Sequence, residues 1–140
     1  FAHTPDGIEK VLTALSANEI IAVFGAGGNR DRTQRPIMGH IAQKLAKICV
    51  VTSDNPRDEN PDEIIDEILG GMQKNERVFV EADRKKAINL AINLAINGEV
   101  IAILGKGDET YQEICGVKYP FCDKDVVEEI LTTKEKADEN

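Results

Sequence analysis

The chain switches repeatedly between short, continuous apolar runs and longer segments in which apolar residues recur every three or four positions. The short runs predict buried strands at 20–24, 48–52, 78–80 and 100–104. The helical spacing predicts helices that begin near Thr4, Pro36, Asn60, Asp83 and Asp123. Strand and helix alternate with short loops. We therefore expect an α/β, Rossmann-like three-layer domain with a mostly parallel sheet and helices on both of its faces.

Local signals set the expected ends of the helices. A hydroxyl, amide or carboxylate stands at the start of each of three segments, as Thr4, Asn60 and Asp83. Proline follows Thr4 and Asn60 at the first helical position, and Glu63 completes a capping-box pattern with Asn60. Glycines at 70–71 and 98 predict where the third and fourth helices stop.

The C-terminal third carries three further expectations. Asn89, Asn93 and Asn97 recur every four residues and predict a polar stripe on the fourth helix. Segments 111–114 and 118–121 have the lengths of two hairpin strands. A last helix is expected from Asp123 to Leu131, followed by a charged, frayed tail at 132–140. We therefore expect one domain over residues 1–131.

Composition narrows the classes of partner. The 140 residues carry a net charge of −8, which argues against nucleic acid and anionic membranes. No apolar stretch approaches the ~20 residues that span a bilayer. The three cysteines have no C-x-x-C spacing, so reduced thiols in a cytoplasm are expected, with Cys49 as a small core residue.

The segment Asp54-Asn55-Pro56-Arg57 follows the second predicted strand. In an open α/β sheet, ligands bind at the carboxyl ends of the strands. An acid beside an arginine suits a ligand of both charge signs, such as an amino acid head group. Equally, Asp54 and Asn55 can form an Asx-turn that leaves Arg57 in water.

Two other strand-end loops are candidates. Residues 25–35 combine glycines with Arg30, Arg32 and Arg35, and glycine lets backbone N–H groups turn toward an anion. Residues 105–112 open with Gly105-Lys106-Gly107 and contain Glu109. Each loop could also be an ordinary glycine turn with solvated charges, which would leave Lys106 on the surface. Neither loop has the G-x-G-x-x-G or P-loop spacing, and no catalytic triad, metal cluster or pair of catalytic carboxylates is evident.

Five segments together resemble one family. They are Ala-His-Thr-Pro-Asp at 2–6, Gly-x-Gly-Gly-Asn-Arg-Asp at 25–31, Arg-Pro-Ile-Met-Gly at 35–39, Thr-Ser-Asp-Asn-Pro-Arg at 52–57 and Gly-Lys-Gly-x-Glu-Thr-Tyr-Gln at 105–112. Their order and spacing resemble the C-terminal domain of the Mur ligases, and most of all the members that add 2,6-diaminopimelate. One residue departs from the pattern, because Asp108 stands where the family usually has His.

The resemblance implies a function in bacterial peptidoglycan synthesis. Mur ligases use ATP and Mg²⁺ to activate a carboxylate as an acyl phosphate, which the amine of an incoming amino acid attacks. It implies a cytoplasmic enzyme whose UDP-sugar and central ATPase domains precede this chain and bind UDP-N-acetylmuramoyl-L-alanyl-D-glutamate, ATP and magnesium. The present domain would bind meso-diaminopimelate and close over ATP, with no catalytic residue or metal of its own.

Family ligand positions carry over to Arg30, Asp54, Asn55, Pro56, Arg57, Gly105 and Glu109. The resemblance places His3 near the nucleotide. Arg57 favours diaminopimelate over lysine, because lysine lacks the distal carboxylate that an arginine would pair. The alternatives are a lysine-adding or folylpolyglutamate-type ligase, or a stand-alone amino-acid-binding domain that has lost its ATPase partner.

Overall fold

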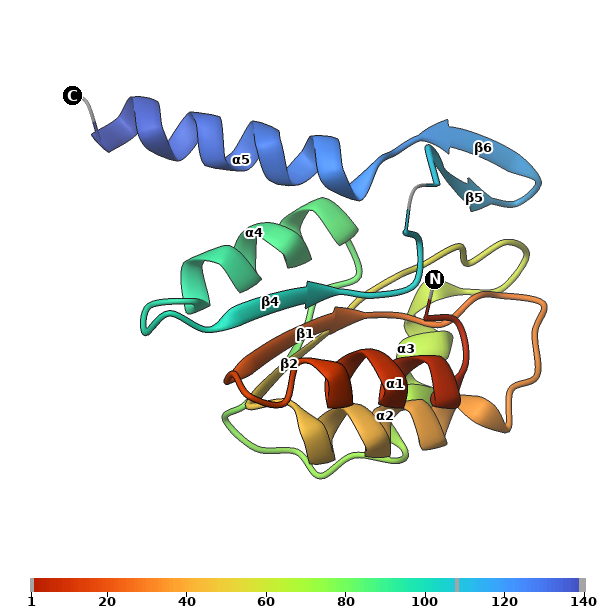
Figure 1. Ribbon diagram of the computed structural model, residues 1–140. Helices are drawn as coiled ribbons and strands as arrows, with labels where there is room; N and C mark the ends of the chain where they lie inside the picture. Colours follow the sequence, from red (N-terminus) through yellow and green to blue (C-terminus); the bar gives the residue numbers. More distant parts are fainter. Residues whose placement is uncertain (1, 108, 139–140) are drawn as a thin grey trace.

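The structure is a computed structural model that describes residues 2–107 and 109–138, so Asp108 lies outside the described residues. Along the chain the elements are α1 (Pro5–Ala14), β1 (Ile20–Phe24), α2 (Gln34–Leu45), β2 (Ile48–Val51), α3 (Pro61–Leu69), β3 (Val78–Val80), α4 (Arg84–Leu94), β4 (Val100–Ile103), β5 (Tyr111–Ile114), β6 (Val117–Pro120) and α5 (Asp123–Asp138). The predicted alternation of strand and helix is confirmed (Figure 1).

The central sheet is parallel and has the strand order β3-β2-β1-β4. Its register places Val23 of β1 beside Val50 of β2 on one side and Ile103 of β4 on the other. The chain builds outward from β1 through β2 to β3, and then returns to add β4 on the opposite side of β1. Loops that leave β1 and β4 therefore diverge at the carboxyl edge, which is where open α/β sheets form ligand crevices.

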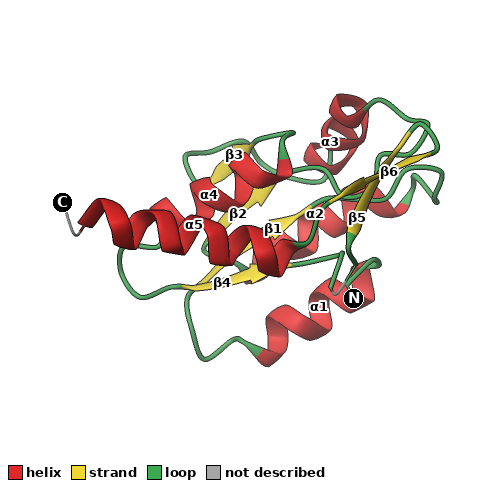
Figure 2. Cartoon of the chain, turned by 90° about the horizontal axis from the view of Figure 1, so that it is seen from above, coloured by secondary structure: helices red, strands yellow, loops and turns green. Residues whose placement is uncertain are grey.

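Helices cover both faces of the sheet (Figures 1 and 2). Successive side chains of β1 point to opposite faces of the sheet, as in any β-strand. Phe24 packs with Leu12 of α1, Met38 of α2 and Ile68 of α3. Val23 packs in the other cluster with residues of α4 and α5, including Ile88 and Ile130. The three-layer prediction is confirmed, and its core is aliphatic, with each buried Ile or Leu contributing about 1.5–3 kcal/mol.

The predicted caps start three helices. Thr4 accepts from Gly7 N at 3.1 Å, Asn60 from Asp62 N at 2.9 Å and Asp83 from Lys86 N at 3.1 Å. The start of α2 was predicted wrongly, because this helix begins at Gln34 and not at Pro36. Proline fits anywhere in the first turn, where backbone N–H groups have no intrahelical acceptor to lose.

Two helix ends also differ from expectation. Helix α4 ends at Leu94, so Asn97 is not part of the polar stripe, and its N–H donates to Glu99 Oε1 at 2.9 Å. Helix α5 continues to Asp138, so residues 132–138 are helical and the expected frayed tail is wrong there. Lys134 Nζ donates to Asn93 Oδ1 of α4 at 2.8 Å, which ties this extension to the neighbouring helix.

The predicted hairpin forms a separate antiparallel sheet of β5 and β6, with β6 one residue earlier than expected. It joins the rest of the molecule through an isolated parallel bridge between Arg57 and Ile114. Arg57 N donates to Glu113 O at 2.9 Å, and Cys115 N donates to Arg57 O at 2.7 Å. The hairpin therefore packs directly against the Asp54–Arg57 loop.

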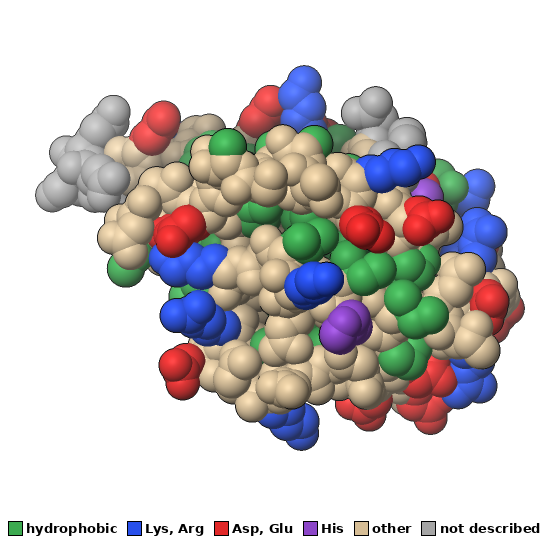
Figure 3. Space-filling view, turned by 60° about the horizontal axis from the view of Figure 1, so that its bottom comes forward, with side chains coloured by type: hydrophobic (Ala, Val, Ile, Leu, Met, Phe, Trp, Pro, Cys, Tyr) green, Lys and Arg blue, Asp and Glu red, His purple; other side chains and the backbone are tan. Residues whose placement is uncertain are grey.

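The burial of Cys49 confirms the prediction that it is a small core residue. Cys49 is buried in β2, and burial raises the pKa of its thiol to about 12, whereas Cys115 is exposed; both are free thiols. On the face seen in Figure 3, acidic and basic side chains are interspersed without a patch of one sign. Among the described helices, none has the length and apolar character needed to cross a bilayer.

Candidate functional site

A cavity of about 390 Å³ brings five of the predicted residues together at the carboxyl edge of the sheet. They are His3, Arg30, Asp54, Arg57 and Glu109. Each comes from a segment that follows a strand or, for His3, precedes α1. The prediction that these distant segments converge on one place is thus met in the geometry, although their role as ligand-binding residues stays a prediction.

Arg57 is held in place by its own backbone and by two acceptors. Its φ of 51° lies in the left-handed region, which few residues other than glycine adopt without cost. Nη1 donates to Gly28 O at 3.0 Å, and Nε lies 3.3 Å from Glu113 Oε1. The alternative in which Arg57 points into water is therefore wrong. Nη2, which has no hydrogen bond to the described residues, remains available on a side chain that lines the cavity.

Asp54 supplies a buried carboxyl group on the wall of the cavity that Arg57 also lines. The residue is 2% exposed, and its carboxylate accepts no hydrogen bond from residues 2–107 and 109–138. Burial raises the pKa of this carboxyl, while the positive charges of Arg84 and Lys106 oppose the rise. A desolvated carboxylate on a cavity wall favours a cationic ligand, because burying a charge without a partner is costly.

Gly105 does not line the cavity, but it shapes it. Its φ is 111°, and a Cβ at this position would overlap Asp54 Oδ2. A side chain here would therefore strain the backbone and displace the Asp54 carboxylate together.

We expect Gly105→Ala to lower the free energy of unfolding by about 1–3 kcal/mol. Urea denaturation of the chain would measure the loss. Gly98→Ala is the matched control, because Gly98 also has a positive φ of 77°, but a Cβ added at Gly98 would lie in open space. Equal losses in the two variants would show that the overlap with Asp54 contributes nothing.

Asn55 and Glu109 are in direct contact. Asn55 Nδ2 donates to Glu109 Oε1 at 3.1 Å, which joins the loop after β2 to the loop after β4. His3 Nε2 lies 3.9 Å from Glu109 Oε2. The side chain of Lys106 is buried beneath this pair, so the alternative of a surface lysine is wrong.

The loop after β1 is held by a buried arginine, Arg35, whose burial was not predicted from the sequence. Arg35 is 1% exposed, and its two terminal nitrogens donate to Glu59, Glu67 and Gly27 O at 2.6–3.0 Å. Arg35 holds the pKa of the Glu59 carboxyl down at about 2. Arg30, in contrast, is exposed and makes no hydrogen bond or ion pair with the described residues.

Two backbone amides of this loop are already occupied. Gly28 N donates to Asn55 O at 2.7 Å, and Asn29 N donates to Glu59 Oε2 at 2.6 Å. The expectation that these N–H groups turn toward an anion is therefore wrong for Gly28 and Asn29. The guanidinium groups of Arg30 and Arg57 also line this cavity.

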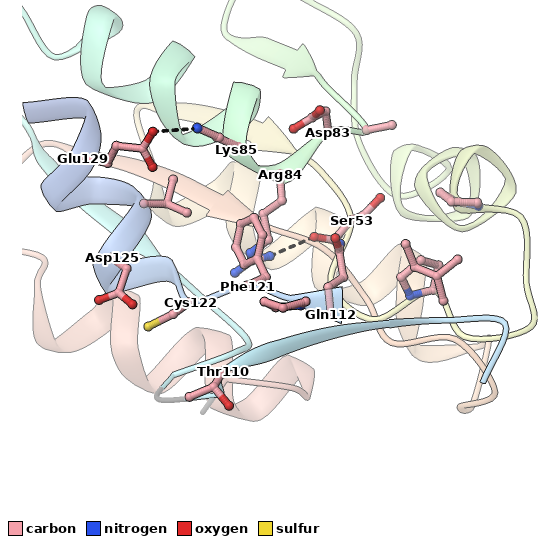
Figure 4. Close-up of a pocket in the computed structure, with 16 residues that line it drawn as sticks. Ser53, Asp83, Arg84, Lys85, Thr110, Gln112, Phe121, Cys122, Asp125 and Glu129 are labelled. Carbon is pink, nitrogen blue, oxygen red and sulfur yellow. Dashed lines mark hydrogen bonds and ion pairs between the residues drawn. The ribbon is translucent and has the colours of Figure 1, made fainter. Parts of the chain in front are cut away.

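A second, larger cavity of about 780 Å³ lies between α4, α5 and the hairpin (Figure 4). Of the predicted residues only Pro56 lines it, so this larger cavity is not where the candidate site residues gather. Its wall contains Arg84, whose Nε and Nη2 each donate to the Asp123 carboxylate at 2.8 Å. Nη1 donates to Ser53 O at 2.9 Å and Nη2 to Leu104 O at 3.2 Å.

Arg84 thus clamps the segments that lead into Asp54 and Gly105. This role of Arg84 was not predicted from the sequence. One signal was present, because Arg84 is the first residue of α4, and a cation at a helix N-terminus opposes the helix dipole. A residue in that position usually has a compensating partner, which here is the Asp123 carboxylate.

The site offers binding chemistry for a zwitterion. Arg30 and Arg57 present guanidinium groups, and Asp54 and Glu109 present carboxylates, around one cavity. In the part of the chain that the structure describes, no group of three His, Cys, Asp or Glu side chains is arranged to hold a metal ion.

Comparisons with known proteins identify a family for the chain. The family model described as "Mur ligase, glutamate ligase domain" matches residues 1–107. The chain is 57% identical over 134 residues to a UDP-N-acetylmuramoyl-L-alanyl-D-glutamate–2,6-diaminopimelate ligase of Aquifex aeolicus, covering 94% of this chain and 28% of that protein. It is 50% identical over 134 residues to the ligase of the same name from Helicobacter hepaticus, covering 96% of this chain and 29% of the relative.

A solved structure of a ligase with this name superposes with a TM-score of 0.90 at 39% identity. The match covers 96% of this chain and 28% of that one. The chain therefore spans somewhat more than a quarter of the length of the relatives that it matches. The family resemblance and the Rossmann-like fold expected from the sequence are both confirmed, and this chain belongs to the Mur ligase family.

Proposed function

We propose that this chain is the C-terminal, amino-acid-binding domain of a ligase that adds meso-diaminopimelate to UDP-N-acetylmuramoyl-L-alanyl-D-glutamate. The observation that carries the proposal is the cavity at the carboxyl edge, whose lining includes both positively charged arginines, among them Arg30 and Arg57, and carboxylates, among them Asp54 and Glu109. Relatives that bear the name of this ligase, 57% and 50% identical to the chain, support the choice of substrate.

The positively and negatively charged side chains of the cavity would pair with different groups of the amino acid. Arg57 and Arg30 would pair with carboxylates of diaminopimelate, since guanidinium and carboxylate form strong, directional hydrogen bonds. Asp54 and Glu109 would accept hydrogen bonds from an ammonium. Asn55 and Pro56 would shape the loop, and Gly105 would leave room for the Asp54 carboxylate.

The remaining chemistry would come from domains outside this chain. ATP and Mg²⁺ would activate the D-glutamate carboxylate as an acyl phosphate, which the diaminopimelate amine attacks. The residues of this chain would bind and orient that amine and exclude water as the domains close. His3, at the edge of the cavity, would lie nearest the nucleotide. The resulting enzyme would act in cytoplasmic peptidoglycan synthesis.

The test compares the complete ligase with the isolated chain. The complete ligase should form the tripeptide product with diaminopimelate far faster than with lysine. The isolated chain should release no ADP from ATP in the presence of either amino acid. A complete ligase that prefers lysine would refute the choice of substrate. Amino-acid-dependent ADP release by the isolated chain would refute its role as a binding domain only.

A further inference from the structure

Lys106 is a fully buried lysine whose ammonium has three acceptors. Nζ donates to Asn55 Oδ1 at 2.6 Å, to Tyr111 O at 2.7 Å and to Glu109 Oε1 at 3.4 Å. An ammonium has three N–H donors, so this set satisfies it completely. The acceptors come from the loop after β2, from strand β5 and from the loop after β4. A single buried charge thus holds three segments together.

This ammonium fixes the orientation of the Asn55 amide. Asn55 Oδ1 accepts from Lys106 Nζ and also from Glu113 N at 3.0 Å, and both partners can only donate. The oxygen must therefore face them, which turns Nδ2 toward Glu109 Oε1. Flipping the amide would place an NH₂ group against two donors and leave all of them unsatisfied.

Lys106 and Asn55 consequently hold the same oxygen of Glu109. The other oxygen, Oε2, lies on the side of His3, and Glu109 lines the cavity whereas Lys106 does not. Without the two donors on Oε1, the carboxylate would be free to rotate toward the arginines of the same cavity. Lys106 therefore acts on the cavity through Glu109.

We propose that Lys106 is a positioning residue, which aims the Glu109 carboxylate at the ammonium of the incoming amino acid. This inference rests on the proposed function, since it requires Glu109 to contact an amino acid. It assigns to the Lys of the Gly105-Lys106-Gly107 turn a role in the interior of the site.

A double-mutant cycle in the complete ligase tests the proposal, with variants Lys106→Met, Glu109→Gln and both together. Lys106→Met keeps the length of the side chain and removes its charge. It should raise the KM for diaminopimelate about 10- to 100-fold, because a misplaced binding group loses affinity on this scale. The KM values for ATP and for the UDP-linked substrate should change less than threefold. Lys10→Met, at an exposed position of α1, should match the wild type.

The double variant separates positioning from a structural role. If Lys106 acts through Glu109, the double variant should have the KM of Glu109→Gln alone, within about threefold. If the KM increases of the two single variants multiply, the proposal is wrong. The same cycle can be measured with whichever amino acid the wild-type ligase accepts, so a wrong choice of diaminopimelate would not decide it.

A second variant covers the case in which Lys106→Met does not fold. Lys106→Gln keeps two N–H donors for Asn55 and Tyr111 and should fold, with an intermediate rise in the KM for the amino acid. Circular dichroism and urea denaturation of each variant would establish folding first. If neither variant folds, the ammonium is a requirement of the fold, and the positioning role is rejected.

Discussion

Replacing Arg57 by Ala in the complete ligase should lower kcat/KM for diaminopimelate. The expected loss corresponds to about 2–5 kcal/mol of transition-state stabilisation, which is the cost of removing one partner of a desolvated charge pair. The KM values for ATP and the UDP-linked substrate should stay near those of the wild type. The slow reaction with lysine should be unchanged or faster, because lysine has no distal carboxylate to lose a partner. Steady-state kinetics with each substrate varied in turn would measure these effects.

A second variant is needed to separate the loss of the Arg57 side chain from strain in its backbone. Alanine is strained at a φ of 51°, so part of the loss in Arg57→Ala would come from the loop itself. Asn tolerates this conformation, and Arg57→Asn should show the same selective loss for diaminopimelate. Arg77→Ala, at an exposed position before β3, is the arginine control and should have no effect. Equal losses for diaminopimelate and lysine would mean that Arg57 contacts the head group common to both.

Asp123→Ala should lower the free energy of unfolding by about 3–5 kcal/mol, because it leaves the buried Arg84 guanidinium without its bidentate partner. Arg84 is 1% exposed and Asp123 6% exposed, so water cannot take the place of the carboxylate. Urea denaturation of the chain would measure the loss.

The neighbouring pair provides the control. Lys85 Nζ lies 3.0 Å from Glu129 Oε1 and joins the same two helices as Arg84 and Asp123, but its side chains are 53% and 62% exposed (Figure 4). Glu129→Ala should cost less than about 1 kcal/mol. If the two variants lose the same stability, burial does not determine the contribution of the Arg84–Asp123 pair.

Most of the fold was predictable because its signals are local. Each strand of the main sheet is a short apolar run, and each of the three capped helices starts at a side chain that bonds an N–H two or three residues later. The convergence of Arg30, Asp54 and Glu109 was also predictable, because the carboxyl ends of parallel strands share one edge. The end of α5 was missed because charge alone predicted a tail, and the contact of Lys134 with Asn93 depends on the position of α4.

The buried charges could not be predicted in the same way. Arg35, Arg84 and Lys106 look like surface residues in sequence, because burial of a charge depends on its partners. Those partners, Glu59, Asp123 and Asn55, are 24, 39 and 51 residues away along the chain. The sequence therefore indicated five of the side chains that line the cavity, but not the buried charges that hold them in place.

The hairpin has a mechanical consequence for the site. It adds no strand to the main sheet, but its backbone is bonded to Arg57 on both sides, through Glu113 O and Cys115 N. A force that shifts β5 must either move the Arg57 backbone with it or break two hydrogen bonds. The position of the Arg57 backbone is therefore coupled to the position of β5, and the geometry of the cavity that Arg57 lines depends on a hairpin that lies outside the main sheet.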